Sequence, residues 1–93
     1  MYFPDLIVEV SSEELGVLMP VNGRHLHKSF ASDRNGITKL TDWLRDLGMH
    51  DCCIRIRIAN PTLIALAVSL AVRLSMDSHA IGLTVGEQLR HAA

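Results

Sequence analysis

The sequence has only two cysteines, and they are the neighbours Cys52 and Cys53. Consecutive residues of a strand point to opposite faces of a sheet, so the two thiols are badly placed to form a disulfide or to share a metal ion. This argues against a disulfide-stabilised scaffold. We expect two reduced thiols in or near the core.

A large excess of charge of either sign is also missing. Nine lysines and arginines stand against ten aspartates and glutamates, which gives a net charge of −1. A dedicated DNA-binding protein usually has a strong basic excess, and an acidic mimic of DNA has the opposite. The composition supports neither class.

The chain has no membrane-spanning run and no recognisable targeting signal. The longest apolar run, in residues 61–72, falls short of the roughly 20 residues that a bilayer span needs. The start of the chain has no basic region, and the apolar residues 6–10 are far fewer than a secretory core. Phosphate-binding and dinucleotide-binding glycine patterns are absent too. We expect a cytoplasmic protein with no membrane association and no cofactor.

Apolar residues are abundant for a chain of this size. The 93 residues predict a single domain over 1–93. The hydrophobic share is 48% and the mean hydropathy is +0.22, which indicates either a packed two-layer core or an apolar surface covered in an oligomer. The composition is therefore compatible with a homodimer.

The clearest local pattern lies at residues 54–58, where three isoleucines alternate with two arginines. A period of two made of β-branched residues predicts a strand. Asn60 can accept a backbone N–H of a first helical turn, and Pro61 has no N–H to leave unpaired, so a helix should begin here. Residues 63–74 are apolar on nearly every side, which predicts a helix buried between two layers.

The first thirty residues predict a three-stranded antiparallel meander. After Asp5, residues 6–10 are an apolar run broken only by Glu9, which is typical of a strand covered on both faces. Further strands are expected at residues 15–20, ending at a proline, and at residues 24–30. An Asn-Gly pair between them is the strongest short hairpin signal.

A helix is expected next, because Ile37, Leu40, Leu44 and Leu47 share one helical face. Gly48 then ends that helix. A last strand is expected at residues 79–85, and one or two helical turns at residues 86–93.

The resulting order is β-β-β-α-β-α-β, followed by a short final helix. This is an α/β arrangement with a mixed sheet, in which three antiparallel strands precede parallel strands and helices lie on both faces. A strand, a crossover helix and the next strand must be parallel and right-handed. The order matches the RNase H-like fold, in which the first and fourth strands are parallel neighbours, although other small α/β sandwiches also satisfy it.

Two stretches resemble a known family. Residues 6–19 read Leu-Ile-Val-Glu-Val-Ser-Ser-Glu-Glu-Leu-Gly-Val-Leu-Met, and residues 30–48 contain a phenylalanine, a short polar turn, a glycine and a Trp-Leu helix. Together with Gln88-Leu-Arg90, they resemble the N-terminal RuvC-like domain of bacterial insertion-sequence transposases of the DEDD, pilin-gene-invertase type. The resemblance implies an RNase H-like fold.

The resemblance also implies where metal-binding acids should be. The family cleaves phosphodiesters with metal ions held by carboxylates, and its first-strand acid falls on Glu9. Its fourth-strand acid falls on Arg57, and the chain stops before the remaining two acids. Two metal ions stabilise the attacking and leaving oxygens only when several carboxylates converge on them. We therefore expect no metal-dependent nuclease activity and no bound metal.

The two degenerate positions have a further interpretation. If the first and fourth strands are neighbours, Glu9 and Arg57 lie across from each other, and in a mostly buried sheet a charge-assisted pair satisfies both groups. We expect a structural ion pair here. The alternative is that Arg55 and Arg57 merely project from an exposed face of the sheet.

Basic residues of the hairpin and the first helix give one more candidate site. The candidate nucleic-acid-binding residues are Arg24, His25, His27, Lys28, Arg34 and Lys39. They could contact phosphates, although a solvated surface is the alternative. His25 and His27 also share one face of a strand, but without a convincing third ligand we expect no metal site.

Two classes of function follow. In the first, the chain is a non-catalytic, transposase-derived protein that binds another protein, for example an inhibitor carried by a mobile genetic element, such as an anti-CRISPR or other anti-defence protein. In the alternative, it is a nucleic-acid-binding fragment of a DEDD-type transposase or recombinase.

Overall fold

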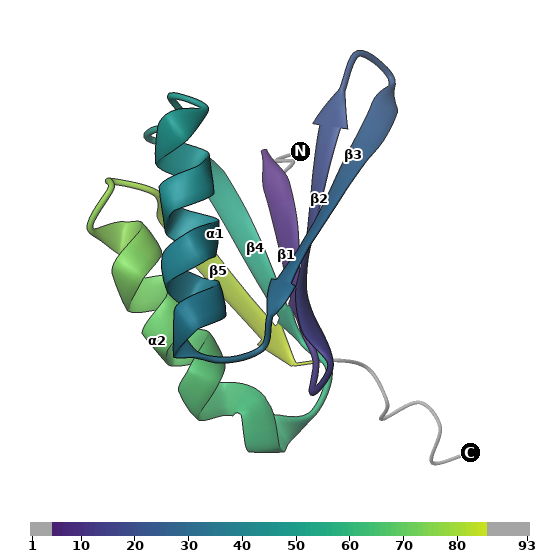
Figure 1. The fold of residues 1–93 in the computed structure, drawn as a ribbon, viewed down its shortest axis with the longest axis vertical. Coiled ribbons are helices and arrows are strands. Elements are labelled where there is room, and N and C mark those ends of the chain that lie inside the picture. Colours follow the sequence, from purple (N-terminus) through teal and green to yellow (C-terminus); the bar gives the residue numbers. More distant parts are fainter. Residues whose placement is uncertain (1–4, 86–93) are drawn as a thin grey trace.

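The computed structural model describes residues 5–85, which form a five-stranded mixed sheet and two helices (Figure 1). The elements in chain order are β1 (Leu6–Val10), β2 (Glu14–Val21), β3 (Arg24–Ala31), α1 (Arg34–Asp46), β4 (Cys53–Ile58), a 3₁₀ turn (Pro61–Leu63), α2 (Ile64–Ser75) and β5 (Ala80–Val85). The sheet order is β3-β2-β1-β4-β5. The helical turns expected at residues 86–93 lie outside the described residues.

The sheet combines antiparallel and parallel pairs. β1 pairs antiparallel with β2, and β2 with β3, which confirms the predicted meander. β1 also pairs in parallel with β4, and β4 with β5. The predicted neighbourhood of the first and fourth strands is therefore present, and β1 lies at the centre of the sheet.

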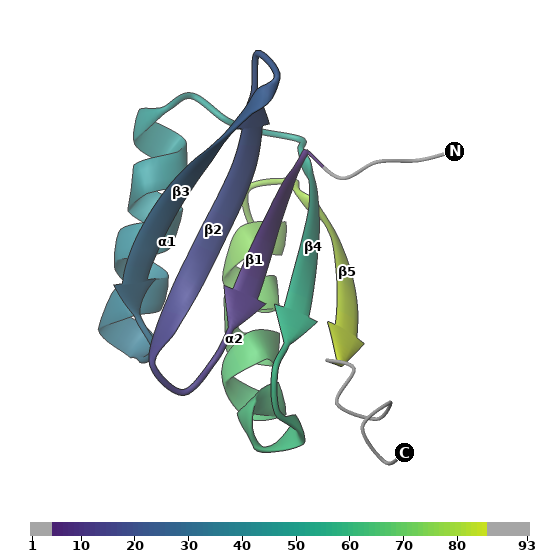
Figure 2. The ribbon, with the colours of Figure 1, turned by 90° about the vertical axis from the view of Figure 1, so that its right-hand side faces the viewer.

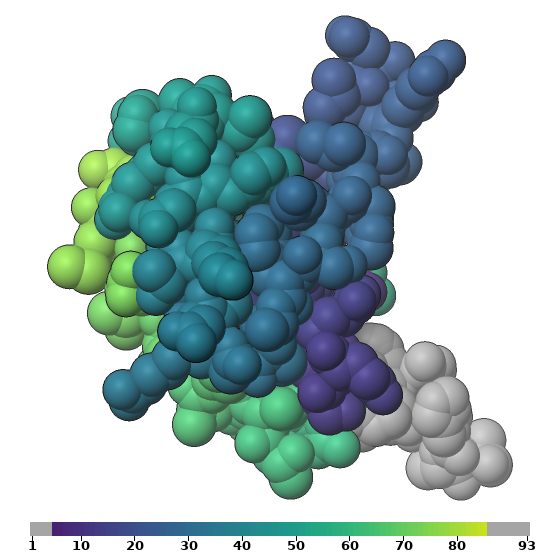
Figure 3. Space-filling model, viewed as in Figure 1, coloured from purple at the N-terminus to yellow at the C-terminus, as the bar shows by residue number. Residues whose placement is uncertain are grey.

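Local signals in the sequence explain the turns. Asn22 and Gly23 have φ values of 50° and 80°, as an Asn-Gly hairpin requires. Pro20 does not end β2 as expected, because the strand continues to Val21 and Pro20 pairs with His25. The β2–β3 hairpin projects beyond the helices, which leaves its tip open to solvent (Figure 3).

A capping side chain starts α1 and the 3₁₀ turn that precedes α2. Asp33 accepts a hydrogen bond from the backbone N–H of Gly36 at 2.8 Å, which starts α1. Asn60 accepts one from the N–H of Thr62 at 3.0 Å, and the turn that begins at Pro61 leads directly into α2. The predicted start near residue 60 is confirmed.

Both helices lie on the same face of the sheet, and Figure 2 shows the sheet in front of them. The expectation of helices on both faces is wrong for residues 5–85. The reason is a strict alternation along β1 and β4: Val8 and Ile56 are fully buried, whereas Glu9 and Arg57 are exposed. Ile7, which made the first strand look apolar on both sides, is only half-buried on the open face.

The helix α2 is not buried between two layers, contrary to the sequence-based expectation. Its sheet-facing residues Ala67, Leu70 and Leu74 have no exposed surface. Its outer residues Val72 and Met76 are 55% and 72% exposed, because nothing in the described part of the chain covers them. The apolar character on every side of α2 therefore includes a bare hydrophobic surface.

A glycine allows the first turn of α1 to lie close to the end of β3. Gly36 is buried in the first turn of α1, and a Cβ placed there would overlap the backbone carbonyl of Ala31 at the end of β3. Main-chain atoms cannot yield as a flexible side chain can. Gly82 in β5 offers a contrast, because a Cβ there would meet no atom within 4 Å.

We therefore expect Gly36→Ala to lower the free energy of unfolding by about 3 kcal/mol, since the helix must move away from β3. Gly82→Ala should leave it nearly unchanged. Urea denaturation followed by circular dichroism measures both variants. Equal stability of the two would contradict the close approach of α1 to β3.

Candidate functional site on the open sheet face

The open face, meaning the face of the sheet opposite α1 and α2, is where the residues singled out from the sequence are brought closest together. Paired residues of neighbouring strands share a face, so the register sets its rows. One row across the sheet consists of His27, Leu18, Ile7, Arg55 and Gly82. The next contains Ser29, Gly16, Glu9, Arg57 and Thr84.

Glu9 and Arg57 are direct partners in the parallel register of β1 and β4. Arg57 Nη1 lies 3.5 Å from Glu9 Oε2, so the structure brings the two charges together. The side chain of Arg57 is 47% exposed and that of Glu9 is 51% exposed, so the expectation of a mostly buried sheet around them is wrong. Arg55 also projects from the open face, and the stated alternative of exposed arginines describes the surroundings of the pair correctly.

The candidate nucleic-acid-binding residues do not form one patch. His25 and His27 pair with Pro20 and Leu18 on the open face, whereas Lys28 pairs with buried Val17 and lies 5.9 Å from the Phe30 ring on the helix side. The strand alternation of β3 thus divides the hairpin residues between two faces.

The two helix residues of that set lie elsewhere again. Arg34 is the first residue of α1, which follows the end of β3 opposite Arg24, and Lys39 is exposed further along the same helix. Eight residues of β3 at about 3.3 Å each separate the two ends by roughly 25 Å. The six residues therefore do not form one contiguous basic patch.

Metal-ligating residues are also scattered. Within residues 5–85, no group of three or more histidines, cysteines, aspartates and glutamates is placed to hold a metal ion. His27 and Glu14 both reach toward Gly16, since a Cβ on that glycine would be 3.5 Å from His27 Nε2 and from Glu14 Oε2. The two side chains alone provide too few ligands for a structural zinc site.

Both cysteines are free and partly buried, which agrees with the expectation of reduced thiols. Burial raises the pKa of the Cys52 thiol above its ordinary value, and the carboxylates of Asp5 and Asp51 raise that pKa further. The thiolate is the reactive form of cysteine. Cys52 is therefore a poor nucleophile at neutral pH.

A histidine that sequence reasoning missed lies between α2 and β5. His79 is only 5% exposed, and its Nδ1 accepts a hydrogen bond from the backbone N–H of Cys52 at 3.1 Å. The Nε2 atom therefore carries the proton of the neutral ring, and it has no partner among the described residues. The only signal in the sequence was the position of His79 as the first residue of a predicted strand, which in the structure begins one residue later, at Ala80.

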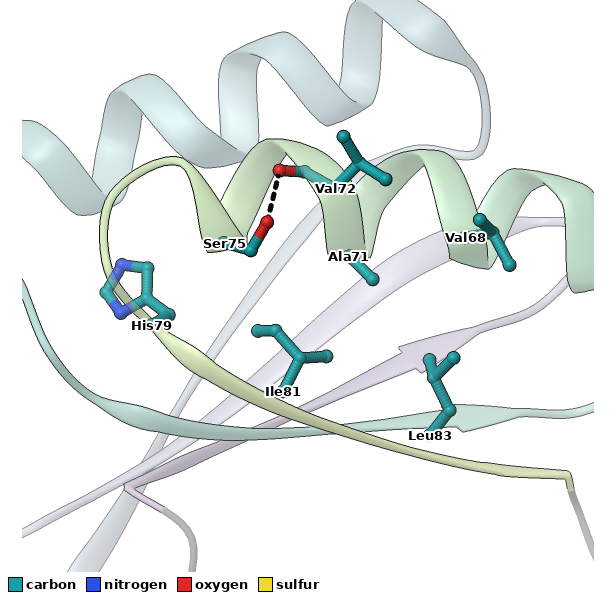
Figure 4. A pocket seen from close by; sticks show the side chains of 7 residues that line it. All are labelled: Val68, Ala71, Val72, Ser75, His79, Ile81 and Leu83. Atoms are coloured by element: carbon teal, nitrogen blue, oxygen red, sulfur yellow. Dashed lines mark hydrogen bonds between the residues drawn. The ribbon is translucent and has the colours of Figure 1, made fainter.

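Beside His79, α2 and β5 form an open groove of about 360 Å³ (Figure 4). Its lining is mostly apolar and consists of Val68, Ala71, Val72, Ser75, His79, Ile81 and Leu83. The view shows the side chains of Val68 and Ala71 on one wall and those of Ile81 and Leu83 on the other.

No protein-family model matches the chain, and a search of curated proteins gives no match. The resemblance to transposase domains thus rests on the sequence stretches quoted for it. Within residues 5–85, neither helix is long and apolar enough to cross a bilayer.

The exposure of the Glu9–Arg57 pair predicts a weak interaction. An exposed ion pair contributes less than about 1 kcal/mol, whereas breaking a buried one costs about 3–5 kcal/mol. We expect Glu9→Gln, Arg57→Gln and the double variant to show a coupling energy below about 1 kcal/mol in a double-mutant cycle measured by urea denaturation. A coupling energy of several kcal/mol would mean that the pair is desolvated.

The hydrogen bond from Cys52 to His79 gives a second prediction. His79→Leu removes the acceptor, so the Cys52 amide should exchange its hydrogen much faster. His79→Asn keeps an oxygen near the position of Nδ1 and should retain most of the protection. Hydrogen exchange followed by NMR measures this, and unchanged protection in His79→Leu would show that the bond is not formed.

Proposed function

We propose that the chain is a non-catalytic, RNase H-like protein that acts in the cytoplasm by binding a protein partner. The fold part of the proposal is supported by the strand order β3-β2-β1-β4-β5 together with the parallel β1–β4 pair. That arrangement agrees with the fold implied by the resemblance to the RuvC-like domain. The difference is that both helices of residues 5–85 lie on one face of the sheet, whereas helices were expected on both faces.

The absence of catalysis is argued from one observation, the pairing of Glu9 with Arg57 at 3.5 Å in the centre of the open face. In the resembling family, both positions hold carboxylates that bind metal. A guanidinium there repels a divalent cation and occupies the one carboxylate that remains. The same two positions therefore serve to balance charge on an exposed sheet.

The open face also suits a protein partner. The half-buried apolar residues Ile7 and Leu18 are register partners at its middle, and Arg55 and Arg57 lie beside them. Apolar side chains and arginines are both common at the centre of protein interfaces. An inhibitor of a bacterial defence protein is the more specific form of this proposal, and it rests on size and resemblance alone.

Nucleic-acid binding is the second candidate, favoured by one feature of the same face. Arg55 has no ion-pair partner among residues 5–85 and lies in the same row as His27. However, neither row contains a phenylalanine, tyrosine or tryptophan to stack on a base, so binding would depend mainly on phosphate contacts.

Two assays test the proposal. We expect no cleavage of DNA or RNA with Mg²⁺ or Mn²⁺, and no retardation of either nucleic acid at low salt. We also expect a protein from the host to bind the wild type but not Ile7→Asp or Arg55→Glu. Lys39→Glu on α1 is the control and should bind normally.

Metal-dependent cleavage would overturn the non-catalytic assignment. Nucleic-acid binding that weakens steeply as salt rises, and that is lost in Arg55→Glu, would favour the second candidate. If Lys39→Glu and Arg55→Glu lose binding to the host protein equally, the interface is not on the open face.

A further inference from the structure

The two edges of the sheet are built very differently. The β3 edge carries four basic or titratable side chains, Arg24, His25, His27 and Lys28. The β5 edge, whose sequence is Ala-Ile-Gly-Leu-Thr-Val, carries neither a charge nor a proline. Natural proteins protect edge strands with charges, prolines or a covering element, because unpaired N–H and C=O groups pair with other chains. Within residues 5–85, β5 pairs only with β4 and has no such protection.

The helix above β5 continues this unprotected surface. Ile64, Val68, Val72 and Met76 follow one another at intervals of four along α2 and its C-terminal end, and they are 42%, 44%, 55% and 72% exposed. Such a spacing puts all four on one side of the helix. The groove between α2 and β5 joins this stripe to Leu83, which is 45% exposed.

Charge distinguishes this surface from the rest of the molecule. The helix α2 has no acidic residue, and Arg73 is its only charged side chain. The seven residues that line the groove include none with a fixed charge. Two copies of the surface can therefore approach each other without repulsion between like charges, which is the requirement for a twofold interface in which the same patch meets itself.

We propose that β5 and α2 form a homodimer interface, in which β5 pairs antiparallel with β5 of a second copy and the two α2 helices face each other across the twofold axis. The pairing extends the sheet from five strands to ten and covers the apolar groove of both copies. It also closes the assembly, because the edges that remain among the described strands are the two charged β3 strands.

The size of the surface sets the expected strength. β5 has 6 residues and α2 has 12, so each runs along the interface for about 20 Å. A surface formed by two elements of this length is smaller than the patch of about 800 Å² that each partner buries in a standard interface. We therefore expect a dimer that dissociates on dilution rather than a permanent one. The inference does not depend on the proposed function, because it uses a different surface from the open face.

Sedimentation of the full chain over a dilution series tests the dimer. The wild type should change from dimer to monomer as it is diluted. Leu83→Glu on β5 and Val68→Glu on α2 should be monomeric at every concentration, with unchanged circular dichroism. Leu26→Glu on β3 is the matched control, because Leu26 is 47% exposed against 45% for Leu83. It should dimerise like the wild type.

Three results would overturn the proposal. A wild type that is monomeric at the highest concentration would mean that β5 and α2 do not form a homodimer interface. Loss of the dimer in Leu26→Glu to the same degree as in Leu83→Glu places the interface at β3 or makes it unspecific. Growth into larger assemblies excludes a closed twofold pair. If Leu83→Glu fails to fold, Val68→Glu on the helix decides the question.

Discussion

The one-sided burial of the sheet is the constraint on which the rest of this structure depends. Along β1 and β4, every second side chain packs against α1 and α2, and the side chains between them face solvent. The predicted ion pair of Glu9 and Arg57 falls in the solvent-facing set. Within residues 5–85, the same arrangement leaves the outer side of α2 without a covering layer.

Local signals in the sequence were sufficient for most of the fold. Asp33 starts α1 and Asn60 starts the 3₁₀ turn that leads into α2, because their side chains accept backbone hydrogen bonds whatever the rest of the chain does. The parallel neighbourhood of β1 and β4 followed from the connection through α1, since a crossover of this kind has few alternatives. The burial of Ile7 and of α2 was misjudged, because apolar character does not say whether another layer is present.

The candidate site was only partly predictable for the same reason. Strand order brought Glu9 and Arg57 together, but the exposure of the pair depends on which face the helices cover. The basic residues of the hairpin were read as a patch, although alternation along β3 sends His27 and Lys28 to opposite faces. His79 was missed, because its contact with Cys52 joins segments that are 27 residues apart.

The central claim, that one face of the sheet is covered and the other open, has a direct test. A soluble paramagnetic probe broadens the NMR signals of methyl groups that it can approach. The methyl signals of Ile7 and Leu18 on the open face should broaden strongly, and those of Val8 and Ile56 beneath the helices should remain sharp. Equal protection of Ile7 and Ile56 would contradict the account, because it would mean that both faces of the sheet are covered.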